Sequence, residues 1–264
     1  GVGQIGTGVE IGQIKRVRDE FLTYRFREQL QYSKWWEKIK ESLEKIEGIF
    51  NEPSETELND ILNQFWSSWQ DLSKNPENMA VRSAVRDTGI KLANSINSLY
   101  ERLVSLRILE NEEISSEVIR INSLTDRIAD INIKIREIEA TGDRANDLRD
   151  KRDALLNELN EIVSIYYVED ELGQVNVYIG GRVALSGGKP MIYGDRKVEL
   201  KFISSEENPL FGKVVWSDDL KEANIVGGSL GALLQSRDVI IPKYIEMLNE
   251  LTKQIVLEVN SIHC

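Results

Sequence analysis

The sequence predicts an α+β protein: an elongated antiparallel helical bundle with long coiled-coil-like helices and an inserted small antiparallel β domain. Two observations predict this fold. Between Gly89 and Gly142 there is no Gly or Pro, and the apolar residues recur every three or four positions, as on one face of a helix. Between Ser164 and Val215 the apolar residues instead alternate with polar ones, which is typical of half-buried strands.

These changes of period divide the chain into three parts. We expect an extended arm at residues 1–16, where Gly residues are interspersed with Val and Ile. A discontinuous helical rod domain follows, made of residues 17–162 and 222–264. The β domain is expected at residues 163–221, inserted between the two helical parts. At 264 residues the chain is long enough to hold both units.

The first helix is expected to begin near Val17 and to stop at Asn51-Glu52-Pro53, because the residue before a proline avoids the helical conformation. The helical period allows nine apolar residues to be laid along one of its faces. They are Phe21, Tyr24, Leu30, Tyr32, Trp36, Ile39, Leu43, Ile46 and Phe50.

A second helix is expected to follow, because Ser54 and Glu57 have the spacing of a capping box. In such a box each side chain accepts a hydrogen bond from an unpaired amide of the first turn. The helix is expected to end near Asn75-Pro76. Its apolar face is expected to consist of Leu58, Ile61, Leu62, Phe65, Trp66 and Trp69.

The longest helix is expected from about Glu77 to Thr141. At about 1.5 Å per residue, its uninterrupted part alone would span on the order of 75–80 Å, so it would act as a strut. Gly142 can take the left-handed conformation that ends a helix, and a further helix is expected from Ala145 to Ile162. The stripe of the long helix that faces a partner comprises Ile114, Val118, Ile121, Leu124, Ile128, Ile131, Ile135 and Ile138.

The β region is expected to contain four to six strands. Alternating residues precede and follow a turn at Asp170 to Gly173, and a later strand follows a second turn at Gly194-Asp195. The residues of these strands are Ile165 and Tyr167, then Val175, Val177 and Ile179, and finally Val198, Leu200 and Phe202.

The C-terminal part returns to the helical period, with Ser229 as the expected N-cap and a break expected near Pro242. An apolar stripe then continues to the end of the chain, and such a stripe needs a partner. We therefore expect this helix to pack back on the N-terminal helices. Its stripe comprises Tyr244 or Ile245, Leu248, Leu251, Ile255, Val259 and Ile262.

Composition argues against several classes of partner. The formal net charge of −11 disfavours nucleic acid and anionic membranes, which attract proteins with a surplus of Lys and Arg. No apolar run approaches the roughly twenty residues of a membrane-spanning helix, and no secretory signal pattern opens the chain.

The sequence predicts no catalytic, cofactor-binding or metal-binding residue, and no cofactor. The single His and Cys, His263 and Cys264, are too few for a zinc site or for the usual nucleophile arrangements. Four acidic residues at near-helical spacing could suggest a cation cluster, but basic residues separate them. We interpret them as a salt-bridge ladder, with Asp147–Lys151 as one pair. The acids are Asp143, Asp147, Asp150 and Asp153, and the bases are Arg144, Arg149, Lys151 and Arg152.

The tryptophans could instead suggest a carbohydrate site. Four of them lie at helical spacing among Leu and Ile, so packing between helices is the favoured interpretation. These four are Trp35, Trp36, Trp66 and Trp69. The fifth, Trp216, lies where the β region rejoins the helices, and we expect it to seal that junction.

Several stretches, in order along nearly the whole chain, resemble the hook-associated protein 1 family of bacterial flagella. Each is weak alone, but together they are specific. They are Ile49-Phe50-Asn51-Glu52-Pro53-Ser54 with Leu62-Asn63-Gln64-Phe65-Trp66 and Trp69-Gln70-Asp71-Leu72; Ala140-Thr141-Gly142 with Ala145-Asn146-Asp147-Leu148-Arg149-Asp150 and Arg152-Asp153-Ala154-Leu155-Leu156; Val175-Asn176-Val177-Tyr178-Ile179-Gly180-Gly181; Gly227-Gly228 through Leu230-Gly231, Leu233-Leu234 and Arg237-Asp238; and Glu258-Val259-Asn260-Ser261-Ile262-His263.

The resemblance implies a non-catalytic axial subunit that forms the junction between hook and filament. It implies an extracellular protein of the flagellum, exported by the flagellar secretion apparatus without a cleaved signal peptide. The implied partners are further copies of the chain in a ring, the hook protein and the second junction protein. An export chaperone would bind through terminal segments expected before Gly1 and beyond Cys264.

Two alternatives remain open at this point. The chain could be a coiled-coil scaffold or adhesin-like binding module with a ligand site on the β insert. It could also be a carboxylate-based hydrolase, since it contains 44 acidic residues, although nothing in the sequence places a catalytic pair.

Overall fold

A computed structural model describes the greater part of the chain. The expected arm at residues 1–16, the expected capping box of Ser54 and Glu57, and the turn at Gly194-Asp195 lie outside the described residues. The described residues are 20–51, 58–187, 189–190, 192–193, 196–204 and 211–263.

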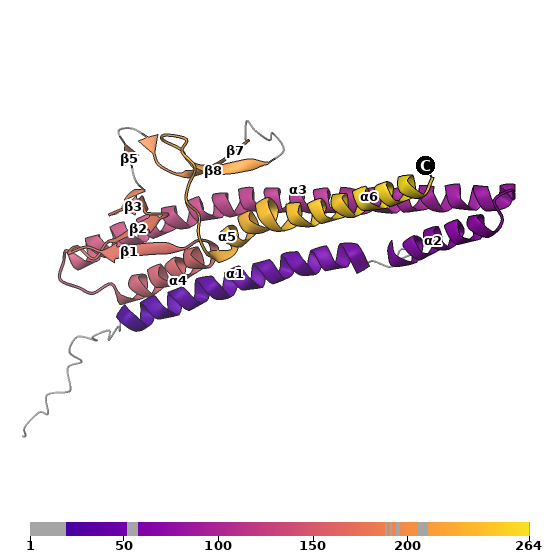
Figure 1. Cartoon of the computed structure of the whole chain (residues 1–264). Helices are drawn as coiled ribbons and strands as arrows, with labels where there is room; N and C mark the ends of the chain where they lie inside the picture. The colour runs from indigo at the N-terminus through magenta and orange to yellow at the C-terminus, as the bar shows by residue number, and fades with distance from the viewer. Residues whose placement is uncertain are drawn as a thin grey trace, which may run out of the picture.

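One helix, α3 (Met79–Glu139), runs the length of the molecule (Figure 1). Its 61 residues correspond to about 90 Å. Two helices, α1 (Glu20–Asn51) and α2 (Leu58–Lys74), follow one another along one side of α3 in the opposite direction. The bundle is therefore antiparallel, as predicted.

The ends of α3 have identifiable causes. At the start, the Asn78 side chain accepts a 2.9 Å hydrogen bond from the Ala80 amide and so caps the first turn. After Glu139 the chain turns through Gly142, whose φ of +93° is the left-handed conformation that the sequence predicts. The helix α4 (Asn146–Ile162) then returns along α3.

The predicted stripe of α3 is buried over most of its length. Six of its eight residues are at most 2 % exposed: Ile114, Val118, Ile121, Leu124, Ile128 and Ile135. Ile131 is half-buried, whereas Ile138, in the last turn of the helix, is 39 % exposed. The stripe therefore loses its cover only where α3 ends.

The C-terminal part contains α5 (Gly228–Gln235), a π-helical turn η1 (Ser236–Ile240) and α6 (Ile241–His263). The expected break near Pro242 is wrong: Pro242 lies in the first turn of α6, and the irregularity is the π turn before it. The helical run continues through Pro242, and because proline has no amide to donate to the carbonyl one turn back, it favours an irregularity of the helix at this point.

The expected N-cap at Ser229 is also wrong. The cap position is Gly227, with no side-chain bond, and α5 begins one residue before Ser229. Gly228 has φ +61°, and a β-carbon added there would lie 2.4 Å from the Ile162 backbone. Glycine therefore allows α5 to begin directly against the end of α4.

The β region contains eight short strands among the described residues, more than the four to six predicted. The first four form an antiparallel sheet in the order β1-β2-β3-β4, and β5–β6 and β7–β8 are separate antiparallel pairs. The strands are β1 (Ile165–Glu169), β2 (Val175–Ile179), β3 (Arg182–Ser186), β4 (Lys189–Pro190), β5 (Ile192–Tyr193), β6 (Arg196–Lys197), β7 (Leu200–Ser204) and β8 (Gly212–Trp216).

The largest apolar core joins these strands to the helices. It combines side chains of α3, α4 and α5 with those of β2, β3, β7 and β8, and includes Trp216 at 4 % exposed. Trp216 thus seals the junction as expected. Strands and helices share this core, so it does not mark a boundary between two domains. The domain boundaries proposed at residues 163 and 221 remain a prediction.

Two smaller apolar clusters follow along the rod. One joins Ile46 of α1 and Leu103 of α3 to Ile241 of α6. In the other, Ile255 and Val259 of α6 pack against a cluster from α2 and α3. The prediction that the C-terminal helix returns to the N-terminal helices is therefore confirmed.

The predicted apolar face of α1 is wrong in part. Ile39 and Ile46 are buried, but Tyr24, Tyr32 and Trp36 are more than half exposed. The buried side of α1 instead contains polar and charged residues, because charged groups of α3 and α4 lie opposite it. The polar residues on this side are Arg27, Lys38 and Ser42.

The packing interpretation of the tryptophans therefore fails for Trp36, which is 63 % exposed. Trp35 is half-buried and meets Trp36 edge-to-face, with 4.6 Å between ring centroids. Trp66 and Trp69 are also half-buried and pack against the α2–α3 cluster, as expected.

The buried stripe generates a stability prediction. Ile128→Asp should lower the free energy of unfolding by several kcal/mol, because it places an unpaired charge in the largest core. Ile119→Asp, at a 68 % exposed position of the same helix, is the matched control and should have little effect. Denaturant unfolding measures both; equal losses would show that burial of the stripe does not determine stability.

Candidate functional site

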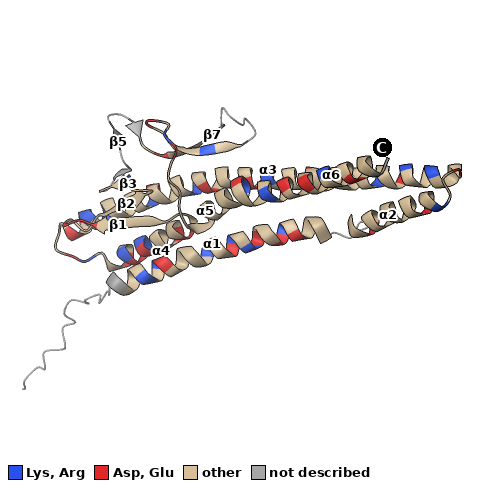
Figure 2. Ribbon diagram, in the orientation of Figure 1, with Lys and Arg blue, Asp and Glu red and all other residues tan. Residues whose placement is uncertain are grey.

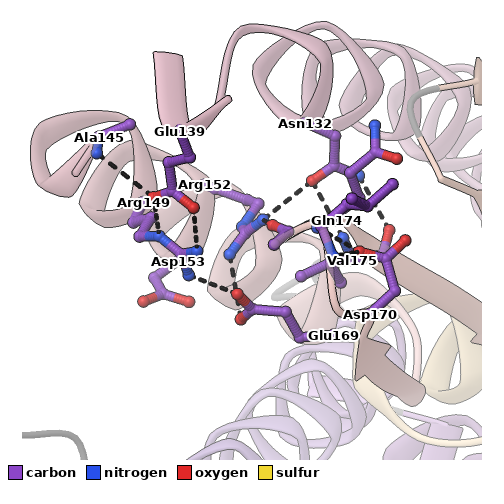
Figure 3. A network of polar contacts seen from close by, with 12 residues as sticks. Asn132, Glu139, Ala145, Arg149, Arg152, Asp153, Glu169, Asp170, Gln174 and Val175 are labelled. Atoms are coloured by element: carbon purple, nitrogen blue, oxygen red, sulfur yellow. Dashed lines mark hydrogen bonds and ion pairs between the residues drawn. The ribbon is translucent and has the colours of Figure 1, made fainter. Parts of the chain in front are cut away.

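Three polar joints connect α3 to the elements packed on it, and they form the candidate functional site. The first, between α3, α4 and the β1–β2 hairpin, is shown in Figure 3. Its central residue is Arg152 of α4, which is completely buried. Its guanidinium donates to Asn132 Oδ1 at 3.1 Å and to the Gly173 carbonyl at 2.5 Å, and it forms a 3.3 Å ion pair with Glu169.

Asn132 of α3 completes the link to the hairpin. Its side-chain amide donates to the carbonyls of Val175 and Gly187 at 2.9 Å each, and its Oδ1 accepts from the Val175 amide at 3.2 Å. One buried side chain thus bonds the start of β2 and the turn after β3. The Asn132 side chain acts both as a donor and as an acceptor toward the strands. The strands therefore have one favoured position along α3.

The outer part of this joint is an ion-pair network. Arg149 of α4 binds Glu139 through two bonds of 2.7 Å each and also pairs with Glu169. The hydrogen bonds between Arg149 and Glu139 lower the pKa of Glu139 and raise the pKa of Arg149. Glu139 also accepts a 3.3 Å bond from the Ala145 amide, so it holds the turn between α3 and α4.

The second joint surrounds Glu110, a completely buried residue of α3. Its Oε1 accepts hydrogen bonds from Ser42 of α1 at 2.7 Å and from Ser236 of η1 at 3.0 Å. Burial raises the pKa of Glu110, and the two serine hydrogen bonds oppose that shift without reversing it. Three elements that are distant in sequence meet at this carboxyl group.

Arg237 extends this joint to the strands. It is 4 % exposed and donates to Asn111 Oδ1 of α3 at 2.7 Å and to the Gly212 carbonyl of β8 at 2.8 Å. The Gly212 amide donates to the same Asn111 oxygen at 3.0 Å. The Arg237 carbonyl accepts a 2.8 Å bond from Arg107 of α3, so η1 is fixed on both sides.

The third joint holds α1 through charges. Lys38 pairs with Glu113 of α3 and with Glu41, and these bonds raise the pKa of Lys38 although its burial acts in the opposite direction. Arg27 forms a 3.2 Å ion pair with Asp153 of α4 and lies over the Tyr167 ring at 4.5 Å.

The acidic residues considered as a cation cluster do not converge. Asp153 pairs with Arg27 across helices, which agrees with the salt-bridge interpretation. In the described residues Asp147 and Lys151 form no ion pair with each other, whereas Arg149, Arg152, Asp153 and Glu158 of α4 do form ion pairs with other elements. In the part of the chain that the structure describes, no group of three or more His, Cys, Asp or Glu side chains is placed to hold a metal ion.

The sequence alone did not identify Glu110 and Asn132. A signal exists for Glu110: it occupies the stripe position between Leu106 and Ile114, where the apolar repeat of α3 is interrupted. Asn132 lies beside the stripe residue Ile131, with no break in the repeat to mark it.

The outer surface of the rod carries charges of both signs. Figure 2 shows Lys and Arg interspersed with Asp and Glu along α1, α3 and α6. No helix among the described residues has the length and apolar character that crossing a membrane requires.

These features define a class of protein: an elongated helical rod whose long helices are fixed to one another and to a small β region. A family model described as the flagellar hook-associated protein FlgK helical domain matches residues 43–264. The chain belongs to this family.

Curated relatives agree. The chain is 34 % identical over 163 residues to flagellar hook-associated protein 1 of Bacillus subtilis, covering 62 % of this chain and 32 % of the relative. It is 28 % identical over 271 aligned positions to the protein of the same name from Salmonella typhimurium, covering 99 % of this chain and 47 % of the relative. Nearly the whole chain thus spans about half of the length of the Salmonella relative.

A solved structure shares the fold. The flagellar hook junction protein FlgK from Burkholderia pseudomallei superposes with a TM-score of 0.63 at 19 % sequence identity. The match covers 79 % of this chain and 38 % of that one.

The first joint generates a mutational prediction. Arg152→Met should destabilise the fold by about 3 kcal/mol, because Glu169 and the Gly173 carbonyl lose a charged donor. Lys151→Met, at the exposed neighbouring position, controls for loss of charge and should be close to neutral. Thermal or urea unfolding measures the difference in stability between the two variants. Equal effects would contradict a stabilising role of the Arg152 contacts.

The second joint generates a pH prediction. A raised folded-state pKa means that the folded chain holds the Glu110 proton more tightly than the unfolded chain. The folded chain should therefore lose stability as pH rises from about 4.5 through that raised pKa. Glu110→Gln cannot ionise, so its stability relative to the parent should increase over this interval. The exposed-site control Glu101→Gln should show no such increase; parallel pH profiles for all three chains would refute the assignment.

Proposed function

We propose that this chain is the core of a non-catalytic axial subunit of the bacterial flagellum, which joins the hook to the filament. The family match over residues 43–264 carries this proposal. It is supported by relatives named flagellar hook-associated protein 1, which are longer than this chain.

The geometry suits a mechanical role. A single α-helix of about 90 Å bends easily, but α3 is held by antiparallel helices along its length. Bending such a bundle requires neighbouring helices to slide past one another. The joints at Glu110 and at Arg152 oppose sliding, because their hydrogen bonds have fixed positions along α3.

In this proposal the full-length protein forms a ring of identical subunits. One side of the ring contacts the hook protein and the other the second junction protein. The subunit is exported by the flagellar secretion apparatus to the extracellular flagellum, and a chaperone binds a terminal segment during export. The interspersed charges along the rod support lateral contacts between copies, since surfaces of mixed sign can pair with one another (Figure 2).

A genetic experiment tests the proposal. Deletion of the full-length gene in the source bacterium should abolish filament attachment and swimming while leaving hooks in place, and the full-length gene should restore both. The same gene carrying Ile128→Asp should fail to restore them because its product does not fold, whereas Ile119→Asp should restore them. Filaments on hooks of the deletion strain would contradict the proposal. Specific ligand binding by the purified chain in a glycan or peptide screen would instead favour a binding module.

A further inference from the structure

A groove runs between the first turns of α1 and the strand β1. Its volume is about 380 Å³, and residues along the whole of β1 line it. Two aromatic residues of its walls are exposed: Tyr24 of α1 is 57 % exposed and Tyr166 of β1 is 60 % exposed. Val168, also in the β1 wall, is 41 % exposed. Large apolar side chains that line an open groove indicate a surface for another segment to cover.

The two walls of the groove run in opposite directions. A β-carbon added to Gly227 would lie 2.9 Å from Gln31 Oε1 and 3.4 Å from the Ser164 β-carbon, so Gln31 lies beside the start of β1. Nearer the other end of the strand, Arg27 lies over the Tyr167 ring at 4.5 Å. The beginning of α1 therefore lies towards the end of β1, and the chain that leads into α1 arrives at that end of the groove.

The strand wall suits an extended occupant. Among the described strands, β1 forms one edge of its sheet, whose order is β1-β2-β3-β4. An edge strand is where an extended segment can lie alongside a sheet. The five residues of β1 span about 17 Å, so five or six extended residues match the length of this wall.

The residues that precede α1 have the sequence of such an occupant. In an extended chain, Val9 and Ile11 point to one side, and Glu10 points to the other. Glycines flank this short stretch at Gly8 and Gly12. One side of the segment is thus apolar, as the exposed walls of the groove require, and the other side carries a charge that can remain in water.

Charges at the end of the groove are also complementary. Lys15 and Arg16 lie between this segment and α1 in the sequence. The acidic residues Asp170 and Glu171 directly follow β1, which ends on the side where α1 begins. Basic and acidic residues would therefore meet at this end if the segment entered the groove.

We propose that residues 9–14, which precede the described part of the chain, occupy this groove in an extended conformation. The segment lies beside β1 and runs in the same direction, with Val9 and Ile11 against Tyr24, Tyr166 and Val168. The five residues between Ile14 and Glu20 are enough for the chain to reverse direction. This contact fixes the direction from which the chain enters the rod. It is a property of the fold and does not depend on the proposed function.

Thiol labelling of the whole chain tests whether the groove is occupied. The reporter is Val168→Cys combined with Cys264→Ser, so that the chain has one thiol. Adding Val9→Asp and Ile11→Asp should expel the segment, because charged groups do not enter an apolar groove. The thiol should then react about tenfold faster or more under native conditions.

Two controls accompany this measurement. Gly8→Asp with Gly12→Asp adds the same charge to the opposite side of the segment and should leave the labelling rate of the Val168→Cys thiol unchanged. A separate reporter, Leu248→Cys with Cys264→Ser, lies at a position of α6 that is 4 % exposed. It should label slowly in both pairs of Asp variants, because the rod stays folded.

A disulfide identifies the occupant. Ile11→Cys with Val168→Cys, in a chain that also carries Cys264→Ser, should form an intrachain disulfide under mild oxidation at low protein concentration. Ile11→Cys with Ile119→Cys is the matched control, since Ile119 is 68 % exposed on α3 away from the groove, and this pair should not form one.

Several results would overturn the proposal. Equal labelling with and without Val9→Asp and Ile11→Asp would show that the segment does not cover the groove. Faster labelling in the Gly8→Asp, Gly12→Asp chain would refute the assigned side, and faster labelling of Leu248→Cys would show general unfolding. Absence of the intrachain disulfide would overturn the proposal independently. A disulfide formed only between two chains would show that the segment of a second copy occupies the groove instead.

Discussion

Burial of the apolar stripe of α3 positions most of the other elements. A 61-residue helix cannot fold back on itself, so other elements must cover its apolar side chains with their own. Between Ile114 and Ile131 the surface takes α4, α5 and the strands into a single core. Nearer the other end, the same helix meets α6 and then α2. The elongated shape follows from the length of the surface on which the cores form.

An apolar stripe alone does not fix where along the helix a partner lies, because Leu and Ile side chains can pack at several offsets. The buried polar residues supply this information. Asn132 and Arg152 give the β1–β2 hairpin one position on α3, and Glu110 does the same for α1 and η1. A polar group buried at the wrong offset would lose its partner, and that penalty separates the correct packing from its neighbours.

The sequence predicts the long helices and strands well because their periods persist over many residues. The stripe of α3, the apolar face of α2 and the return of α6 to the N-terminal helices all follow from repeated apolar spacing. The errors concern features that depend on tertiary partners. The seam of α1 is polar because Asp153 and Glu113 lie opposite it, and no local pattern reveals those partners. Near Pro242 the rule for proline predicts a break, whereas the helix continues there after a π turn, Ser236–Ile240. For the site, only Glu110 interrupts a repeat, whereas Asn132 and Arg152 have no sequence signal of their own.

The polar seam of α1 means that different kinds of contact hold different parts of the rod together. Arg27, Lys38 and Ser42 hold α1 through ion pairs and hydrogen bonds, whereas the strands and α4 are held to α3 mainly by apolar area. Dissolved ions screen exposed charges more than buried ones, so these largely buried contacts keep most of their strength in salt. Apolar contacts add to them nearer the end of α1, where Ile46 packs with side chains of α3 and α6. The chain thereby combines an apolar framework with an outer helix that accepts only matching charges along its seam.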